Sequence, residues 1–393
     1  MKQLLLVILL VVESPILFAQ KVPVNEFAAI DKMALQMPDS LTKTTNAIAS
    51  YIDAHFTTDH EKARAAFIWV ASNIQYDIAN MFALNFYEKP QEKVSKPLRE
   101  RKGICENYAA LFTEICNKSG LKAYVVEGYT KQNGFADYIP HAWSAAQIGD
   151  TWFLFDPTWG SGYANGGKFY KKINNSYFIV EPSIFIKSHM PFDYMWQFLP
   201  YPVTNQEFYE GKTQENKTKP FFDFRDSIRV HLSKDSMEQW ISTANRIEKN
   251  GMKNSMIFDR FHHLKSEIEM SKQKRVISLY NAAGAEFNAG IHFFNEFINF
   301  RNKQFVPKKT DPEIQQMLDT VAHSFQNASL KLNQIVPFTE EQSNSVSHLR
   351  KAVEEANVQL KEQQAWLKEY MSKGKAGRKS MFYKVSWFGI PIN

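Results

Sequence analysis

Cysteine is scarce in this chain, whose 393 residues include only Cys105 and Cys116. That count excludes a framework of several disulfides. On one helix, with a rise of about 1.5 Å per residue, the two cysteines would lie roughly 16 Å apart, which is too far for a disulfide. We therefore expect Cys105 to carry a free thiol and Cys116, inside the same helix, to be a small core residue.

Long apolar runs are also missing, because nothing after the first twenty residues is long enough to cross a bilayer. The N-terminus has the pattern of a signal peptide: Lys2 precedes an apolar run over 4–12, and Ala19 offers a cleavage point. We expect residues 1–19 to be removed and the protein to be exported, periplasmic or extracellular, with no transmembrane segment left. An uncleaved anchor or a lipidated tail is the alternative, although no cysteine stands where lipidation would need one.

A strong charge of one sign is absent as well. The chain has 47 basic and 41 acidic residues, a formal net charge of +6. Because this excess is spread thinly, a solvated basic surface is favoured over a nucleic-acid site, and we predict no nucleic-acid partner. The basic run over 373–379 is interpreted as a flexible linker, with contact to an acidic surface as the alternative.

Apolar residues make up 44% of the sequence, which allows real cores, and the length predicts two or three domains. Residues 205–219 are charged and polar and show no regular spacing of apolar residues, so we predict a domain boundary there. Residues 211–269 are predicted as a linker region with strands, at 222–232, and a helix. Three stretches with three- and four-residue apolar spacing predict an antiparallel helical bundle over 270–372, followed by a C-terminal tail over 373–393.

A polar, proline-punctuated stretch over 85–99 is predicted to be a loop that leads to a glycine turn and Cys105. Cys105 opens an apolar helix, and the positive end of that helix favours the thiolate, which is the form that attacks carbonyls. The backbone amide at the same helix end supplies half of an oxyanion hole.

His141 starts a predicted strand over 141–148, and Asp156 ends a second strand over 151–156. The dipeptide Gly149-Asp150 between them suits a tight hairpin, so antiparallel pairing places His141 beside Asp156. In this arrangement His141 is the base that takes the thiol proton, and Asp156 orients its ring.

Two tryptophans flank these residues. Trp143 and Trp159 are predicted to wall an acyl-binding groove, with plain packing as the alternative. The glycine-rich stretch 160–167 lacks the lysine of a phosphate loop and is interpreted as a flexible rim beside the site. A further histidine, His189, is interpreted as a surface residue or as a support for the site.

These motifs resemble the transglutaminase-like superfamily, in the branch that includes kyphoscoliosis-peptidase and cytokinesis-protein domains. The residues that carry the resemblance are Gly103–Ala109, Gly128-Tyr129, His141–Trp143, Trp152–Gly160, Trp69–Asp77, Phe185–Pro191 and Trp196–Leu199. The resemblance implies an α+β fold for residues 20–210, a papain-like transglutaminase core in which helices pack on an antiparallel sheet. It also implies an intact triad of Cys105, His141 and Asp156. No acidic cluster resembles the calcium sites of animal transglutaminases, so we predict no metal and no cofactor.

Three functions remain open. The first is an exported thiol enzyme, a cysteine-type peptidase or amidase or a protein-glutamine gamma-glutamyltransferase-like enzyme, which acts on peptide or protein amides through an acyl-thioester; hydrolysis is favoured over transamidation. The second is a catalytically silent scaffold whose helical C-terminal domain recruits a protein partner or self-associates, and a buried Cys105 would favour it. The third, a cell-envelope carbohydrate or lipid enzyme using carboxylates, lacks a closely spaced acidic pair.

Overall fold

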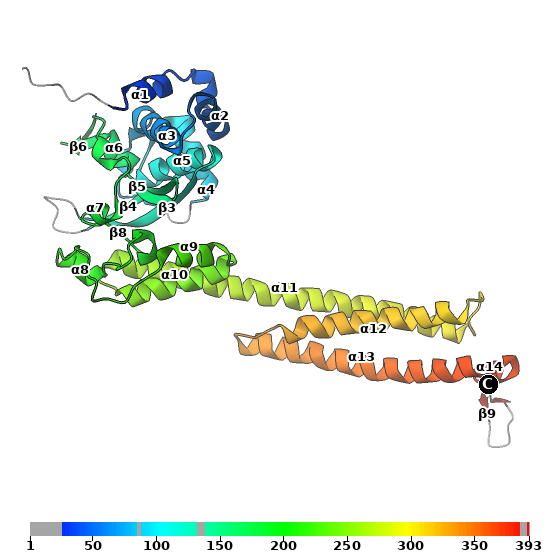
Figure 1. Cartoon of the computed structure of the whole chain (residues 1–393). Coiled ribbons are helices and arrows are strands. Elements are labelled where there is room, and N and C mark those ends of the chain that lie inside the picture. Colours follow the sequence, from blue (N-terminus) through cyan, green and yellow to red (C-terminus); the bar gives the residue numbers. More distant parts are fainter. Residues whose placement is uncertain (1–25, 85–87, 132–137, 386–390, 393) are drawn as a thin grey trace, which may run out of the picture. The chain divides into compact units, whose positions relative to one another are not determined.

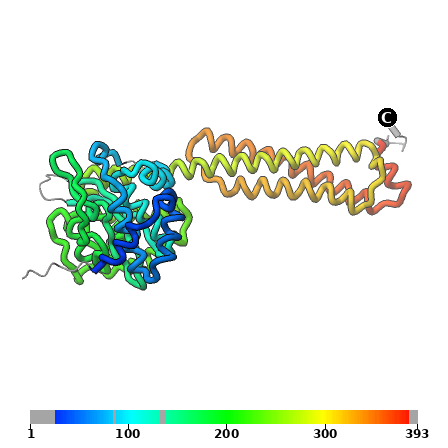
Figure 2. The backbone as a smooth tube through the Cα atoms, turned by 90° about the horizontal axis from the view of Figure 1, so that it is seen from above, coloured from blue at the N-terminus to red at the C-terminus, as the bar shows by residue number. Residues whose placement is uncertain are grey.

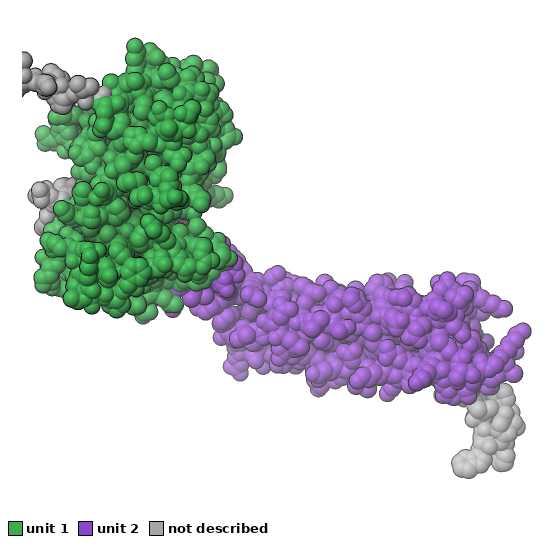
Figure 3. Space-filling view, in the orientation of Figure 1, with its two compact units in different colours: residues 1–234, 242–261 green, residues 235–241, 262–393 purple. Residues whose placement is uncertain are grey.

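The computed structural model describes residues 26–84, 88–131, 138–385 and 391–392 (Figure 1). The predicted signal peptide lies outside the described residues. The chain divides into two compact units, which Figure 3 colours separately. Unit 1 consists of residues 1–234 and 242–261, and unit 2 of residues 235–241 and 262–393. Most of the predicted linker region therefore clusters with unit 1.

The helices are α1 (Ala28–Leu35), α2 (Thr45–His55), α3 (Asp59–Asn73), α4 (Pro90–Glu100), α5 (Cys105–Lys118), α6 (Pro157–Ser161), α7 (Pro182–Phe185), α8 (Asn205–Tyr209), α9 (Phe224–Leu232), α10 (Ser236–Asn250), α11 (Ser255–Asn302), α12 (Asp311–Asn333), α13 (Glu340–Ser372) and α14 (Lys375–Ser380). The strands are β1 (Gln75–Tyr76), β2 (Lys102–Gly103), β3 (Lys122–Thr130), β4 (Ile139–Ile148), β5 (Thr151–Phe155), β6 (Gly162–Asn165), β7 (Lys168–Lys171), β8 (His189–Pro191), β9 (Lys384–Val385) and β10 (Pro391–Ile392).

Unit 1 is built around a four-stranded antiparallel sheet in the order β5-β4-β3-β8. The predicted hairpin is present, with β4 and β5 paired from Ile148–Thr151 at the turn to Ser144–Phe155. β3 pairs with β4 along its whole length, and β8 adds to the far end of β3. This topology confirms the predicted α+β core and brings β8, distant in sequence, to the strands that carry His141 and its neighbours.

Alternating side chains give the sheet two apolar faces. One face, with Ala146 and Phe155, packs in the same core as α3 and α5. The opposite face, with Trp143 and Leu154, packs against the segment that follows β5 in sequence. The hydroxyl of Ser144 on β4 donates to a backbone carbonyl of α5 at 3.1 Å, so the cysteine helix is tied directly to the histidine strand.

Four sequence predictions are wrong in detail. Residues 224–232 form the helix α9 in place of strands, because the side chain of Asp223 caps it and its periodic positions bury one face. The predicted loop 85–99 contains α4 from Pro90 onward. The basic run 373–379 is not a flexible linker, since it leads into α14, whose Arg378 forms two hydrogen bonds with Asp311.

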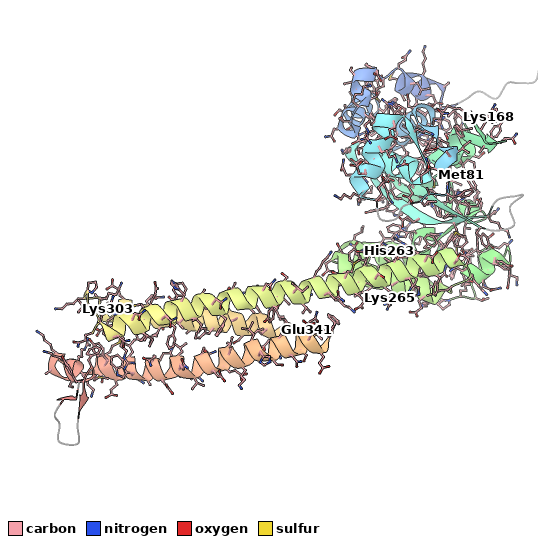
Figure 4. All side chains as sticks on the ribbon, turned by 180° about the vertical axis from the view of Figure 1, so that it is seen from behind. Met81, Lys168, His263, Lys265, Lys303 and Glu341 are labelled. Atoms are coloured by element: carbon pink, nitrogen blue, oxygen red, sulfur yellow. The ribbon has the colours of Figure 1, made fainter. Side chains whose placement is uncertain are left out.

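The fourth correction concerns the glycine-rich stretch over 160–167. It forms the end of α6 and then the β6–β7 hairpin, on which Figure 4 marks Lys168. Gly166 and Gly167 both have positive φ angles, +55° and +72°, at the hairpin turn. The glycines therefore encode a tight turn, for which the left-handed region is needed at both central positions.

Unit 2 contains the predicted helical bundle. α11, α12 and α13 follow one another through short connections and run antiparallel, as Figure 2 shows. Side chains of all three helices meet in a common core that includes Phe297, Phe325 and Leu360. A capping box of Thr310 and Glu313 opens α12. No helix among the described residues combines the length and apolar composition needed to cross a membrane.

Candidate active site

Cys105 is the first residue of α5 and directly follows the short strand β2 and Ile104. The amide of Asp77 donates to the carbonyl of Gly103 at 2.9 Å, which holds this strand in place. The side chain of Asn107 accepts from the amide of Ile104 at 2.9 Å and so starts the helix. A Cβ at Gly103 would lie 2.7 Å from the Cβ of Asn107, so glycine is needed at this turn. The thiol is thereby fixed at the positive end of α5.

His141 and Asp156 lie side by side, as the hairpin predicts. His141 Nε2 is 2.8 Å from Asp156 Oδ2. The other carboxylate oxygen, Oδ1, accepts from the amides of Thr158 and Trp159 at 2.9 and 3.1 Å, so Asp156 is also the N-cap of α6. Because Nε2 faces Asp156, Nδ1 is the ring atom left for Cys105, which acts on His141 through its charge and through side-chain hydrogen bonding.

Charges decide the protonation state of this cluster. Burial lowers the pKa of His141, but the charge of Asp156, followed by that of Cys105, outweighs burial and raises the pKa to about 10. Burial also opposes ionisation of Asp156, yet the positive charge of His141 holds the pKa of that carboxyl well below its ordinary value. His141 and Asp156 are thus suited to an imidazolium–carboxylate pair beside the Cys105 side chain.

His189 of β8 joins the same cluster, a role that sequence reasoning left open between surface and support. Its Nε2 is 3.2 Å from Asp156 Oδ2, the oxygen that also bonds His141. Its Nδ1 lies 2.8 Å from the hydroxyl of Ser188. The ring stacks on Phe185 with centroids 3.9 Å apart. The sequence feature that could have pointed to His189 is its position within residues 185–191, a segment that resembles the transglutaminase-like superfamily.

The two tryptophans occupy different environments. Trp143 is buried, next to Phe185 and the ring of His189, which corresponds to the packing alternative. Trp159 is partly exposed, and its ring centroid lies 5.4 Å from that of His141 and 4.5 Å from that of His189. A groove wall at Trp159 therefore stays a prediction consistent with this position.

Tyr76 is a further neighbour of this cluster. It lies on β1, opposite Gly103, and its ring contacts Tyr108 of α5. Burial, followed by the charges of Cys105 and Asp156, raises the pKa of Tyr76. Its hydroxyl therefore stays protonated at neutral pH and keeps its capacity to donate a hydrogen bond near Cys105.

The cluster is largely closed to solvent. Cys105 is 1% exposed, His141 5% and Asp156 0%. Cys105 and Cys116 are both free thiols, as predicted, and Cys116 lies in the core of unit 1.

His141, Asp156 and His189 also offer one metal-ligating atom each, all within 4.8 Å of one another. In the structure these atoms are hydrogen-bonded to one another through Asp156 Oδ2. A metal ion would have to replace both of these hydrogen bonds, so the arrangement is accounted for by the imidazoles and the carboxylate alone.

Comparison with known proteins shows which family this part of the chain is similar to. Residues 46–157, which include the cysteine, histidine and aspartate of the cluster, match the Transglutaminase-like superfamily. They form a transglutaminase-like domain. Human kyphoscoliosis peptidase is 36% identical to the chain over 164 residues, which cover 40% of this chain and 24% of that protein. Hillarin of Drosophila melanogaster is 26% identical over 205 residues, covering 47% and 24% of the two chains.

A solved structure, described as that of a TGase, is 21% identical and covers 41% of this chain and 40% of that one, with a TM-score of 0.24. The chain spans about a quarter of the length of the curated relatives it matches.

Proposed function

We propose that the transglutaminase-like domain is a thiol enzyme that acts on peptide or protein amides, with hydrolysis favoured over transamidation. The observation that carries the proposal is the buried contact between His141 Nε2 and Asp156 Oδ2, with Cys105 as the other partner of His141. A carboxylate that fixes an imidazole beside a thiol at a helix N-terminus is the arrangement that activates a nucleophile.

The proposed reaction has two steps. The Cys105 thiolate attacks the amide carbonyl, the C–N bond breaks, and His141 gives its proton to the leaving amine, which leaves an acyl-thioester. Water then attacks the thioester while His141 accepts its proton, and the acid and free thiol are released; an amine in place of water gives transamidation. The amide of Cys105 and the protonated hydroxyl of Tyr76 are the proposed donors to the oxyanion.

Alkylation by iodoacetamide tests the proposal without a known substrate. We expect Cys105 to react far faster at acidic and neutral pH than an ordinary thiol, and His141→Ala to remove this advantage. Cys116 is the internal control, because it is fully buried and burial raises its pKa; peptide mapping separates the two sites. A peptide library then tests turnover, with Cys105→Ala as the inactive variant.

The burial of Cys105 favours a second candidate. A catalytically silent domain that serves as a scaffold, with the helical bundle of unit 2 recruiting a partner or a second copy, would need no access to the thiol. This candidate predicts slow alkylation of Cys105 in both the native protein and His141→Ala. Pull-down or light-scattering experiments with the full chain would then measure association directly.

Export is a separate part of the proposal. It is supported only by the pattern of the first nineteen residues, with its positive start, apolar run and small residue at the cleavage point. Cell fractionation of the full chain and of a form lacking residues 1–19 tests it: the full chain is expected outside the cytoplasm and the shortened form inside.

A further inference from the structure

Asp156 Oδ2 accepts hydrogen bonds from two imidazoles at once. His141 Nε2 lies 2.8 Å from this oxygen and His189 Nε2 lies 3.2 Å from it. His189 and Asp156 are both fully buried as side chains. A carboxylate oxygen in such a place needs donors, and here it has one from each side, β4 and β8.

The two imidazoles are in opposite electrostatic situations. Burial lowers the pKa of His189 to about 4, whereas the charges of Asp156 and Cys105 raise that of His141 despite burial. Nε2 of His189 must donate to the carboxylate, so in the neutral ring Nδ1 is the acceptor, and the hydroxyl of Ser188 at 2.8 Å is placed to donate to it. This geometry fits a neutral His189 with its proton on Nε2, which is the form that burial favours.

We propose that His189 is a positioning residue: as a neutral donor it holds Asp156 against His141 and thereby extends the thiolate–imidazolium pair of Cys105 and His141 to lower pH. The inference rests on the proposed function. Phe185 keeps the ring in place by stacking at 3.9 Å. A charged group at this position would compete with His141 for the carboxylate, which a neutral imidazole does not.

The pH dependence involves the titratable groups that act on Asp156 or on its partner His141, together with those on which Asp156 acts. These groups are His141 from β4, His189 from β8, Cys105 from α5, Tyr76 from β1 and Tyr177 from the segment before α7. The hydrogen bond from His189 lowers the pKa of Asp156. Its removal therefore lets Asp156 take up a proton at higher pH, and His141 then loses the negative charge that keeps it protonated.

The test is the alkylation rate of Cys105 between about pH 4 and pH 9 in four full-length proteins. His189→Phe keeps an aromatic ring but removes the donor. His189→Gln keeps an N–H donor, and Ser188→Ala removes only the partner of Nδ1. We expect the acid limb of the profile to move up by about one pH unit in His189→Phe, about a tenfold slower reaction at a fixed acidic pH. The other two variants are expected to stay close to the native profile.

The outcomes separate this inference from the proposed function. If His141→Ala removes the fast reaction but His189→Phe leaves the acid limb unmoved, the inference is overturned and the proposed function stands. If His141→Ala also leaves the alkylation rate of Cys105 unchanged, the proposed function is contradicted, and the inference that rests on it is overturned as well. Should His189→Phe not fold, nitrogen chemical shifts of His189 in the native protein decide the matter: a neutral ring with its proton on Nε2 at pH 6 supports the inference, and a charged ring or the Nδ1 tautomer contradicts it.

Discussion

Gly128 lies directly opposite His141 in the β3–β4 ladder, at the position where β8 also joins β3. A Cβ on Gly128 would lie 2.2 Å from the carbonyl oxygen of Met190 and 2.6 Å from Cη2 of Trp143. The absence of a side chain therefore lets three strands and one indole ring close around the histidine.

Replacing Gly128 by alanine should disturb both stability and reactivity. The added methyl must move the backbone of β8 or the ring of Trp143, which costs about 1–3 kcal/mol of unfolding free energy. Because β8 carries His189, we also expect slower alkylation of Cys105. Urea unfolding and the alkylation rate measure the two effects; a variant with native values for both would show that the sheet accommodates the methyl.

A buried ion pair in unit 1 gives a second prediction. Arg64 is fully buried, and its Nε and Nη2 lie 2.7 and 2.8 Å from the two carboxylate oxygens of Asp31. Asp31→Ala leaves this guanidinium without its main counter-charge, so we expect a loss of about 3–5 kcal/mol in unfolding free energy. The matched control is Asp39→Ala. Asp39 and its partner Lys43 are both exposed, so the loss of this ion pair should not measurably change the unfolding free energy. Equal effects in the two variants would contradict the argument.

The protonation of His141 predicts how stability depends on pH. Its pKa in the fold is raised to about 10 from an ordinary 6.5, so its contribution is complete below about pH 6.5 and is lost as pH rises through about 10. The lowered pKa of Asp156 makes its contribution present above its ordinary value of 3.8 and lost as pH falls. The stability advantage of the native protein over His141→Gln should thus be largest between about pH 4 and pH 6.5 and shrink toward pH 10. Urea unfolding at several pH values measures it, and an advantage that grows with pH would refute the assignment.

Two glycines of α11 provide a matched pair in the bundle. A Cβ on Gly290 would lie 2.6 Å from two ring carbons of Phe325 on α12, whereas a Cβ on Gly284 meets no atom within 4 Å. Gly284→Ala should stabilise unit 2 by up to about 1 kcal/mol through helix propensity. Gly290→Ala should destabilise it by about 1–3 kcal/mol because the methyl forces the helices apart. Thermal unfolding of the two variants gives shifts of opposite sign if the packing is as described.

The sequence predicts best where a signal is local. Gly149-Asp150 between two alternating stretches defines the β4–β5 hairpin, and the hairpin brings His141 to Asp156 without further information. The helix after Cys105 and the three bundle helices follow from their apolar periods in the same way.

Contacts between residues that lie far apart in the sequence cannot be predicted from local patterns. β8 has only three residues, too few for a period of two, so alternation of apolar residues could not predict the pairing of His189 with the carboxylate of Asp156. Arg378 forms a hydrogen bond with Asp311, which lies 67 residues earlier in the sequence. This contact makes the basic run, which the sequence predicts to be a linker, part of unit 2. α9 has only nine residues, and an apolar pattern of that length does not separate a helix from a strand.

Asp156 does two jobs with its two oxygens: Oδ1 caps α6 through the amides of Thr158 and Trp159, and Oδ2 faces the imidazoles. Selection for folding alone would keep this aspartate in a descendant that had lost all chemistry, because the helix still needs its cap. At the start of α5 the corresponding bond to the backbone comes from Asn107, whose side chain accepts from the amide of Ile104. Under the proposed function, we therefore expect an inactivated lineage to lose Cys105 before Asp156, and residue 105 would be the better marker of activity.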